Sequence, residues 1–273
     1  MTAAGQARIR EVFARARDEH RAALIGYLPA GYPSVAAATD AMAAMVDAGV
    51  DLVEVGLPYS DPLMDGPVIQ QAVDAALRAG TTTADVLGTV ESLAARGIPS
   101  LVMSYWNPIE HYGAARFATD LATAGGLGVI TPDLIPDEAD DWLSAARSQG
   151  LGTVFLVAPS STDQRLARTA HACRGFVYAA STMGVTGARQ EVGSAARLLV
   201  ERTRQVTDLP VAVGLGVSTG EQAAQVAAFA DGVIVGSALV RCLLDDSSQP
   251  DRLASVAALV ADLARGVRRP LPR

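Results

Sequence analysis

Eight short apolar runs recur along this chain, and segments with helical periodicity separate them. The runs are AALIGYL (22–28), DLVEVGL (51–57), PSLVMSY (99–105), GLGVIT (126–131), GTVFLVA (152–158), GFVYAAS (175–181), PVAVGLG (210–216) and DGVIVGS (231–237). Segments such as SVAAATDAMAAMVDAG (34–49) and TADVLGTVESLAARG (83–97) carry apolar residues at helical spacing. The pattern therefore predicts eight successive units of a strand followed by a helix.

Eight such units in 273 residues predict an α/β fold of the (β/α)8 TIM-barrel type, formed as a single domain over residues 1–273. An amphipathic segment at residues 6–19 precedes the first strand, and we expect an N-terminal helix there that closes the barrel bottom. An open doubly wound sheet is the competing architecture. It usually has five or six strands and often a glycine fingerprint, which YLPAGYPS (27–34) does not match.

Composition excludes several kinds of chemistry and of partner. The net charge of −7 argues against nucleic acid as a partner. All 22 basic residues are arginines, which excludes Schiff-base catalysis, a lysine-bound pyridoxal phosphate and a P-loop lysine. His20, His111 and His171 lie far apart and form no zinc-binding pattern, so no metal site is expected. The chain shows neither a signal-peptide core nor a membrane-spanning run, which predicts a cytoplasmic protein without a membrane partner.

In a barrel of this type, function resides at the carboxyl ends of the strands and in the loops that follow them. Long connections are more often functional than short ones. We expect long irregular connections at residues 56–67, at WNPIEHYG (106–113) and at residues 181–192. A functional site is therefore expected at these three segments.

Glu54 lies in the strand that leads into the first of these segments and is the most informative residue of the chain. Strand alternation places Leu52 and Glu54 on one face, with Val53 and Val55 on the other. The valines suit the helix-covered side, so Glu54 is expected to point into the barrel. A buried glutamate is costly unless it is paired, and functional sites are where such carboxylates concentrate. A structural ion pair with an arginine is the alternative.

Asp65 lies in the loop that follows the strand of Glu54. By itself, DGPVIQ (65–70) could be a helix start, with Asp65 as the N-cap and Pro67 in the first turn. The loop also returns Asp65 to the end of the barrel where Glu54 lies. Two carboxylates at one mouth, in different environments, can hold different protonation states.

Glycine-bearing loops after the predicted sixth, seventh and eighth strands indicate a phosphate site. Backbone N–H groups at such loops and at helix N-termini bind anions without a cationic side chain. Ordinary turn glycines are the alternative. Aromatic residues also end several strands and either line a flat pocket or pack in the core: Tyr27, Tyr105, Phe176 and Tyr178.

Taken together, these features resemble the α chain of tryptophan synthase. The most specific part of the resemblance is VEVGLPYSDPLMDGP (53–67), and it extends over nearly the whole chain. Further matches occur in the family's order: SYWNPI (104–109), TPDLIP (131–136), FVYAASTMGVTG (176–187), VGLGVS (213–218) and VIVGSALV (233–240).

The resemblance implies a lyase of tryptophan biosynthesis that cleaves indole-3-glycerol phosphate to indole and glyceraldehyde 3-phosphate by a retro-aldol reaction. It implies that Glu54 is the acid–base group and that Asp65 accepts the indole N–H. The substrate-binding residues it implies are Tyr27, Tyr105, Tyr178, Gly187, Leu215, Gly216, Gly236 and Ser237. Many relatives carry phenylalanine in place of Tyr27 and Leu215.

The family also implies a partner. Its α chain binds a pyridoxal-phosphate β chain as an αββα heterotetramer, so no cofactor is expected on this chain. Pro58 and Asp61 are then expected to face the β chain. Three alternatives stay open from the residues: a stand-alone lyase with the same catalytic groups, a non-catalytic subunit that regulates the β chain, and another phosphate-binding barrel such as an isomerase of the same pathway.

Overall fold

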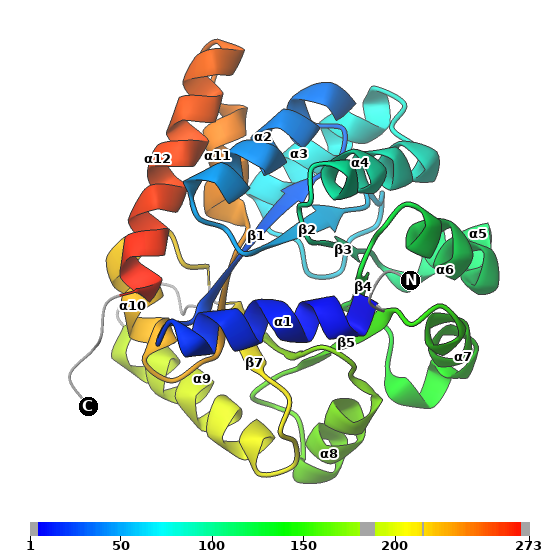
Figure 1. Ribbon diagram of the computed structural model, residues 1–273, viewed down its shortest axis with the longest axis vertical. Coiled ribbons are helices and arrows are strands. Elements are labelled where there is room, and N and C mark those ends of the chain that lie inside the picture. Colours follow the sequence, from blue (N-terminus) through cyan, green and yellow to red (C-terminus); the bar gives the residue numbers. More distant parts are fainter. Residues whose placement is uncertain (1–4, 181–188, 215, 269–273) are drawn as a thin grey trace.

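Eight parallel strands close into a barrel in which each strand hydrogen-bonds to the next and β8 pairs with β1 (Figure 1). The computed structural model describes all residues except 1–4, 181–188, 215 and 269–273. The strands are β1 (Ala23–Pro29), β2 (Leu52–Gly56), β3 (Ser100–Met103), β4 (Gly128–Thr131), β5 (Gly152–Val157), β6 (Val177–Ala180), β7 (Val211–Gly214) and β8 (Gly232–Val235). The predicted (β/α)8 barrel is confirmed.

Helices surround the barrel and connect successive strands (Figure 1). They are α1 (Gly5–Asp18), α2 (Val35–Ala48), α3 (Pro67–Arg78), α4 (Thr83–Ala95), α5 (Trp106–Tyr112), α6 (Ala114–Thr123), the short 3-10 helix η1 (Pro136–Glu138), α7 (Asp140–Ser148), α8 (Asp163–Ala172), α9 (Arg189–Arg204), α10 (Gly220–Ala227), α11 (Ser237–Leu244) and α12 (Gln249–Val267).

Local sequence signals define where helices begin and end. The Ser34 hydroxyl accepts the N–H of Ala37 at the start of α2, and Gly49 ends that helix with a φ of 125°. At α4, Thr82 and Asp85 form a reciprocal capping box. One expectation was wrong: WNPIEHYG is not an irregular connection, because its first seven residues form α5.

Helix α1 closes the bottom of the barrel, as the N-terminal segment predicts. Its buried face includes Ile9 and Phe13, which pack among the inward-facing side chains of the strands. The rings of Phe13 and Phe176 lie 5.3 Å apart between centroids. The N–H of Gln6 donates to the carbonyl of Gly150, just before β5, which places the start of α1 at the amino ends of the strands. The other end of the barrel, at the carboxyl ends of the strands, is not covered by α1 and is where a site is expected.

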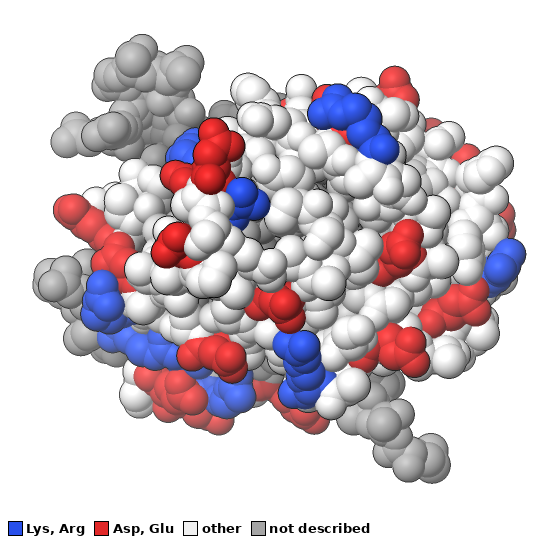
Figure 2. Space-filling view, turned by 90° about the horizontal axis from the view of Figure 1, so that it is seen from above, with Lys and Arg blue, Asp and Glu red and all other residues white. Residues whose placement is uncertain are grey.

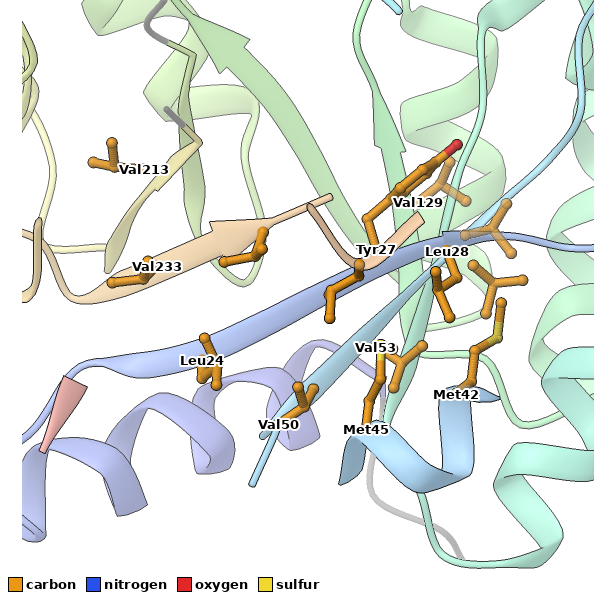
Figure 3. Packing of buried hydrophobic residues seen from close by; sticks show 14 of the residues in the cluster. Leu24, Tyr27, Leu28, Met42, Met45, Val50, Val53, Val129, Val213 and Val233 are labelled. Atoms are coloured by element: carbon orange, nitrogen blue, oxygen red, sulfur yellow. The ribbon is translucent and has the colours of Figure 1, made fainter. Parts of the chain in front are cut away.

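Side chains alternate across the barrel wall as expected for β2. Leu52 packs with the barrel interior, whereas Val53 and Val55 pack in the outer cluster formed by strands and helices. Figure 3 shows Met42 and Met45 of α2 beside Val53 in that outer cluster. The alternation directs Glu54 inward, which is the orientation that the sequence predicts.

No helix in the described part of the chain is long and apolar enough to cross a membrane. Acidic and basic side chains are interspersed over the face seen in Figure 2, where no continuous basic area is visible.

Candidate active site

Glu54 is fully buried inside the barrel, with 0% of its surface exposed. Neither of its carboxyl oxygens has a hydrogen-bond partner among the residues that the structure describes. Burial without a partner penalises the ionised form and raises the pKa of Glu54 to about 8. A protonated carboxyl group therefore lies in the barrel at neutral pH, which does not fit a structural ion pair.

Asp51, three residues earlier at the start of β2, shows what a structural carboxylate looks like in this fold. It is 5% exposed, and the Arg21 guanidinium donates to both of its oxygens at 2.6 and 2.8 Å. The N–H of Leu24 donates to it as well, at 2.9 Å. Arg15 donates to Oδ1 at 3.3 Å, so each oxygen accepts two hydrogen bonds, and this stabilises the buried carboxylate. Glu54 lacks these contacts, and this is typical of a group kept for chemistry.

Asp65 lies in the loop between β2 and α3 and does not cap the helix. The N-cap of α3 is Gly66, and no side chain caps this end. Instead, the Tyr105 hydroxyl donates to Oδ1 of Asp65 at 3.1 Å. Partial burial raises the pKa of Asp65, and the Tyr105 hydrogen bond opposes this rise. The N-cap alternative is thus excluded, and Tyr105, from the end of β3, orients the carboxylate.

Tyr27 and Tyr178 occupy space that glycines leave open. The phenol of Tyr27 lies against Gly56, and the phenol of Tyr178 lies against Gly214, so that a Cβ at either glycine would overlap the ring. Tyr27 pairs in register with Glu54 across β1 and β2. In Figure 3 its ring points to the side of β1 opposite Leu24.

The charges of the two carboxylates act on the pKa values of Tyr27 and Tyr178. Burial, followed by the charges of Asp65 and Glu54, raises the pKa of Tyr27 well above its ordinary value. Burial and then the charge of Glu54 do the same for Tyr178. Both carboxylates therefore lie within electrostatic range of Tyr27. The mouth holds two carboxyl groups and three phenols, because Tyr105 joins them through Asp65.

The predicted phosphate residues lie at the ends of β7 and β8. Gly216 has a φ of 68°, which favours glycine, and a Cβ there would meet nothing within 4 Å. Gly236 is the N-cap of α11 and Ser237 is its first residue, so the free N–H groups of that helix begin here. Gly187 and Leu215 lie outside the described residues.

The segment from Pro58 to Met64 extends from the same mouth. Pro58 is buried, whereas Asp61 is exposed and accepts the Ser60 hydroxyl at 2.5 Å. Leu63 and Met64 are 78% and 54% exposed. Exposed apolar side chains on a loop next to a site are typical of a surface that another molecule covers.

Three residues near this mouth were not predicted from the sequence to have a role: Asp133, Met103 and Leu156. Both carboxylate oxygens of Asp133 accept the N–H of Trp106, which fixes the start of α5 directly after Tyr105. Met103 and Leu156 pack on the interior cluster and are only partly buried. Asp133 belongs to TPDLIP, a segment that the resemblance includes. Strand alternation in β3 and β5 would have indicated that Met103 and Leu156 face the barrel interior.

A closed parallel barrel with a buried carboxyl group that has no partner among the described residues, and with a second carboxylate at its mouth, indicates an acid–base enzyme of the (β/α)8 class. A sequence model of the family described as tryptophan synthase alpha chain matches residues 13–268. The tryptophan synthase alpha chain of Salinispora arenicola is 60% identical over 94% of this chain and 97% of the relative. That of Acidothermus cellulolyticus is 57% identical over 98% of both chains.

Solved structures agree with this relationship. A structure of Mycobacterium tuberculosis tryptophan synthase matches with a TM-score of 0.89 and 56% identity, over 96% of this chain and 99% of that one. The alpha subunit from Legionella pneumophila matches with a TM-score of 0.87 and 32% identity, over 95% and 98%. The chain therefore belongs to the tryptophan synthase alpha chain family. It is a lyase of tryptophan biosynthesis that cleaves indole-3-glycerol phosphate.

Proposed function

We propose that Glu54 moves the protons during this cleavage and that Asp65 holds the indole N–H. The observation that carries the proposal is the fully buried Glu54 carboxyl group, which has no hydrogen-bond partner in the described part of the chain. Its environment keeps it protonated at neutral pH, ready to act as an acid.

The reaction breaks the bond between indole C3 and the hydroxyl-bearing carbon of the glycerol chain. C3 must gain a proton so that the ring can accept the electron pair of the breaking bond. The hydroxyl must lose its proton as its carbon becomes the aldehyde of glyceraldehyde 3-phosphate. The two transfers balance, so one group that first donates and then accepts a proton is sufficient.

Glu54 fits this double role. Its pKa of about 8 means that it starts protonated and can donate to C3. The carboxylate left behind lies in a dry environment that favours its protonated form, so it readily takes the hydroxyl proton. The two steps return Glu54 to its starting state, and no metal or cofactor on this chain enters the balance.

Asp65 fits the role of acceptor for the indole N–H. It is partly buried, and the Tyr105 hydroxyl already donates to one of its oxygens. The other oxygen can accept from the indole nitrogen and stabilise the positive charge that develops there when C3 is protonated. Tyr27 and Tyr178, whose rings are fixed over Gly56 and Gly214, supply walls for the substrate.

The phosphate of the substrate is assigned to backbone groups of Gly216, Gly236 and Ser237, together with Gly187. Support comes from the α11 N-terminus, which begins at the end of β8 beside Tyr27: a Cβ at Gly236 would lie 3.3 Å from Cδ1 of that ring. N–H groups at a helix start attract an anion without a lysine, which this chain lacks.

A pyridoxal-phosphate β chain is the proposed partner, in an αββα heterotetramer, and the cofactor is assigned to that chain. Support comes from the exposed side chains of Leu63 and Met64, on the loop that also carries Asp61 and Asp65. A partner that covers this loop would fix Asp65, which links docking to catalysis. A cytoplasmic location stays a prediction from the sequence.

Indole release from indole-3-glycerol phosphate tests the proposal, measured while a tryptophan synthase β chain is titrated. The lyase rate should rise by about 5–150-fold on binding, a typical coupling of 1–3 kcal/mol. Asp61→Ala should weaken this activation more than the solo rate, whereas Asp65→Asn should depress both. A flat response in the wild type would favour a stand-alone lyase, and full activity of Asp65→Asn would remove Asp65 from the mechanism.

A further inference from the structure

A second concave site lies on the outside of the barrel wall, away from the mouth that holds Glu54. Its volume is about 420 Å³, and its lining comes mainly from α7, α8 and the start of β5, together with Gln6 of α1, Pro136 of η1 and Arg174. Thr153, in that lining, belongs to β5 and neighbours the inward-facing Val154, so it faces the helices. The volume lies within the range of about 300–1,000 Å³ that is usual for small-molecule sites.

The pocket exists because α7 and α8 do not pack closely on each other. Helix α7 packs against α6 and β5, whereas α8 packs against β5, α9 and η1. Figure 1 shows the two helices on neighbouring sides of β5. The space left between them exposes apolar side chains, which include Leu143 and Ala172.

Three arginines line this pocket from different elements: Arg147 from α7, Arg168 from α8 and Arg174 from the turn before β6. Arg168 is neutralised by Asp137 at 2.7 Å. Arg174 donates only to the carbonyls of His171 and Cys173, both at 2.7 Å, and Arg147 has no hydrogen-bond or ionic partner among the described residues. Among the described residues, neither Arg147 nor Arg174 has a carboxylate partner, in a chain whose net charge is −7.

We propose that the pocket between α7 and α8 binds an organic phosphate, with the phosphate at Arg147 and Arg174 and an apolar body on Leu143 and Ala172. Two uncompensated cations match a phosphomonoester dianion better than a monocarboxylate. The arginine fork suits phosphate oxygens, to which it can donate two parallel hydrogen bonds. The apolar lining distinguishes this site from one for inorganic phosphate.

Phenyl phosphate is the probe, titrated into the chain while backbone amide resonances are followed by NMR. The amides of Arg147, Leu151 and Arg174 should shift along one saturable curve. Binding at the barrel mouth is recorded separately by the amides of Gly236 and Ser237. Inorganic phosphate carries only the anionic group and benzyl alcohol only the apolar ring. Each should bind the α7–α8 pocket at least about tenfold more weakly than phenyl phosphate.

Arg147→Gln is the test variant, because this side chain makes no hydrogen bond or ion pair in the described part of the chain. It should weaken phenyl phosphate at the pocket by about tenfold, and Arg147→Glu should weaken it further. Arg165→Gln, an exposed arginine of α8 outside the lining, should leave binding unchanged, and no variant should alter indole release. The proposal is overturned if the pocket amides stay still up to about 10 mM probe, if Arg147→Gln binds like the wild type, or if benzyl alcohol binds as tightly.

Discussion

The hydroxyl of Tyr105 donates to Oδ1 of Asp65 at 3.1 Å and accepts the N–H of Met64 at 3.0 Å. One phenol at the end of β3 thus holds the loop that follows β2. The two residues are 40 positions apart in sequence, and the pairing of β2 with β3 brings them together. The Tyr105 hydrogen bond holds the Asp65 carboxylate in place and opposes the rise in its pKa that burial causes.

Removal of that hydroxyl should change the pH dependence of catalysis. The Tyr105 hydrogen bond lowers the pKa of Asp65 against the rise caused by burial, so Tyr105→Phe should raise this pKa. Asp65 acts as a carboxylate, and the acid limb of kcat/KM for indole release should therefore move to higher pH. The loss at neutral pH should be about tenfold or more, as for a hydrogen bond to a charged group.

Tyr59→Phe is the matched control for this change. The Tyr59 ring lies 5.4 Å from that of Tyr105, between centroids, and its hydroxyl makes no hydrogen bond within the described part of the structure. The pH profile of kcat/KM for Tyr59→Phe should follow that of the wild type. An acid limb that does not move in Tyr105→Phe would show that Tyr105 does not set the ionisation of Asp65.

Glu54 should make the stability of the protein depend on pH. Its pKa is raised from 4.5 to about 8 on folding, so the folded state retains a proton that the unfolded chain releases. The contribution of Glu54 to stability is complete below pH 4.5 and is lost as the pH rises through about 8. The loss should be on the order of a few kcal/mol.

Glu54→Gln carries no such proton and removes this pH dependence. Urea unfolding should show the variant more stable than the wild type at pH 8, with the difference shrinking toward pH 5. A difference that is constant over this interval, or that grows toward acid pH, would contradict a buried, protonated Glu54.

Gly214 should tolerate no side chain, because of Tyr178. A Cβ at this position would overlap the Tyr178 hydroxyl and lie 2.9 Å from its Cε1. Gly214→Ala should therefore displace the ring, lower kcat/KM and reduce the melting temperature. The double variant Gly214→Ala/Tyr178→Phe should recover part of the stability, since the nearest atom is gone.

Gly88→Ala provides the control, because an added Cβ at this exposed position of α4 meets nothing within 4 Å. Alanine there should stabilise the helix by about 0.5–1 kcal/mol and leave activity unchanged. If Gly214→Ala behaved like Gly88→Ala, the Tyr178 ring would not be held where the structure places it.

Gly236 tests the assignment of the phosphate to backbone groups. Gly236→Val should block the approach to the α11 N-terminus and press on Tyr27, so KM should rise by about tenfold or more. Ser237→Ala keeps the backbone N–H and should have the milder effect. The assignment fails if Ser237→Ala raises KM as much as Gly236→Val, because the hydroxyl would then carry the binding.

Period-two alternation in DLVEVGL was enough to predict that Glu54 faces the barrel interior, because that rule depends only on neighbours in sequence. That Glu54 has no partner among the described residues was not predictable, since this requires the position of every neighbouring strand. The hydrogen bond between Asp65 and Tyr105 was not predictable for the same reason. The helix-start signal in DGPVIQ is correct for α3, which begins at Pro67, but Gly66 is its N-cap and Asp65 bonds instead to Tyr105, which follows β3.

Other misses have local or spatial causes. WNPIEHYG looks irregular because of its proline, yet Asp133 accepts the first N–H of α5 from 27 positions away and the helix forms. The Tyr27 hydroxyl had no predictable neighbour, because Gly56 leaves room for it only through strand register. The pocket between α7 and α8 depends on helix spacing, which composition does not encode.

The proton-transfer role of Glu54 is tested most directly by indole release from indole-3-glycerol phosphate in Glu54→Gln, measured with substrate binding and with the β chain present. The amide keeps the size of the side chain and removes proton exchange. Release should fall by about 10²–10⁴-fold or more while substrate still binds. A variant that retains turnover within about threefold of the wild type would contradict the role of Glu54.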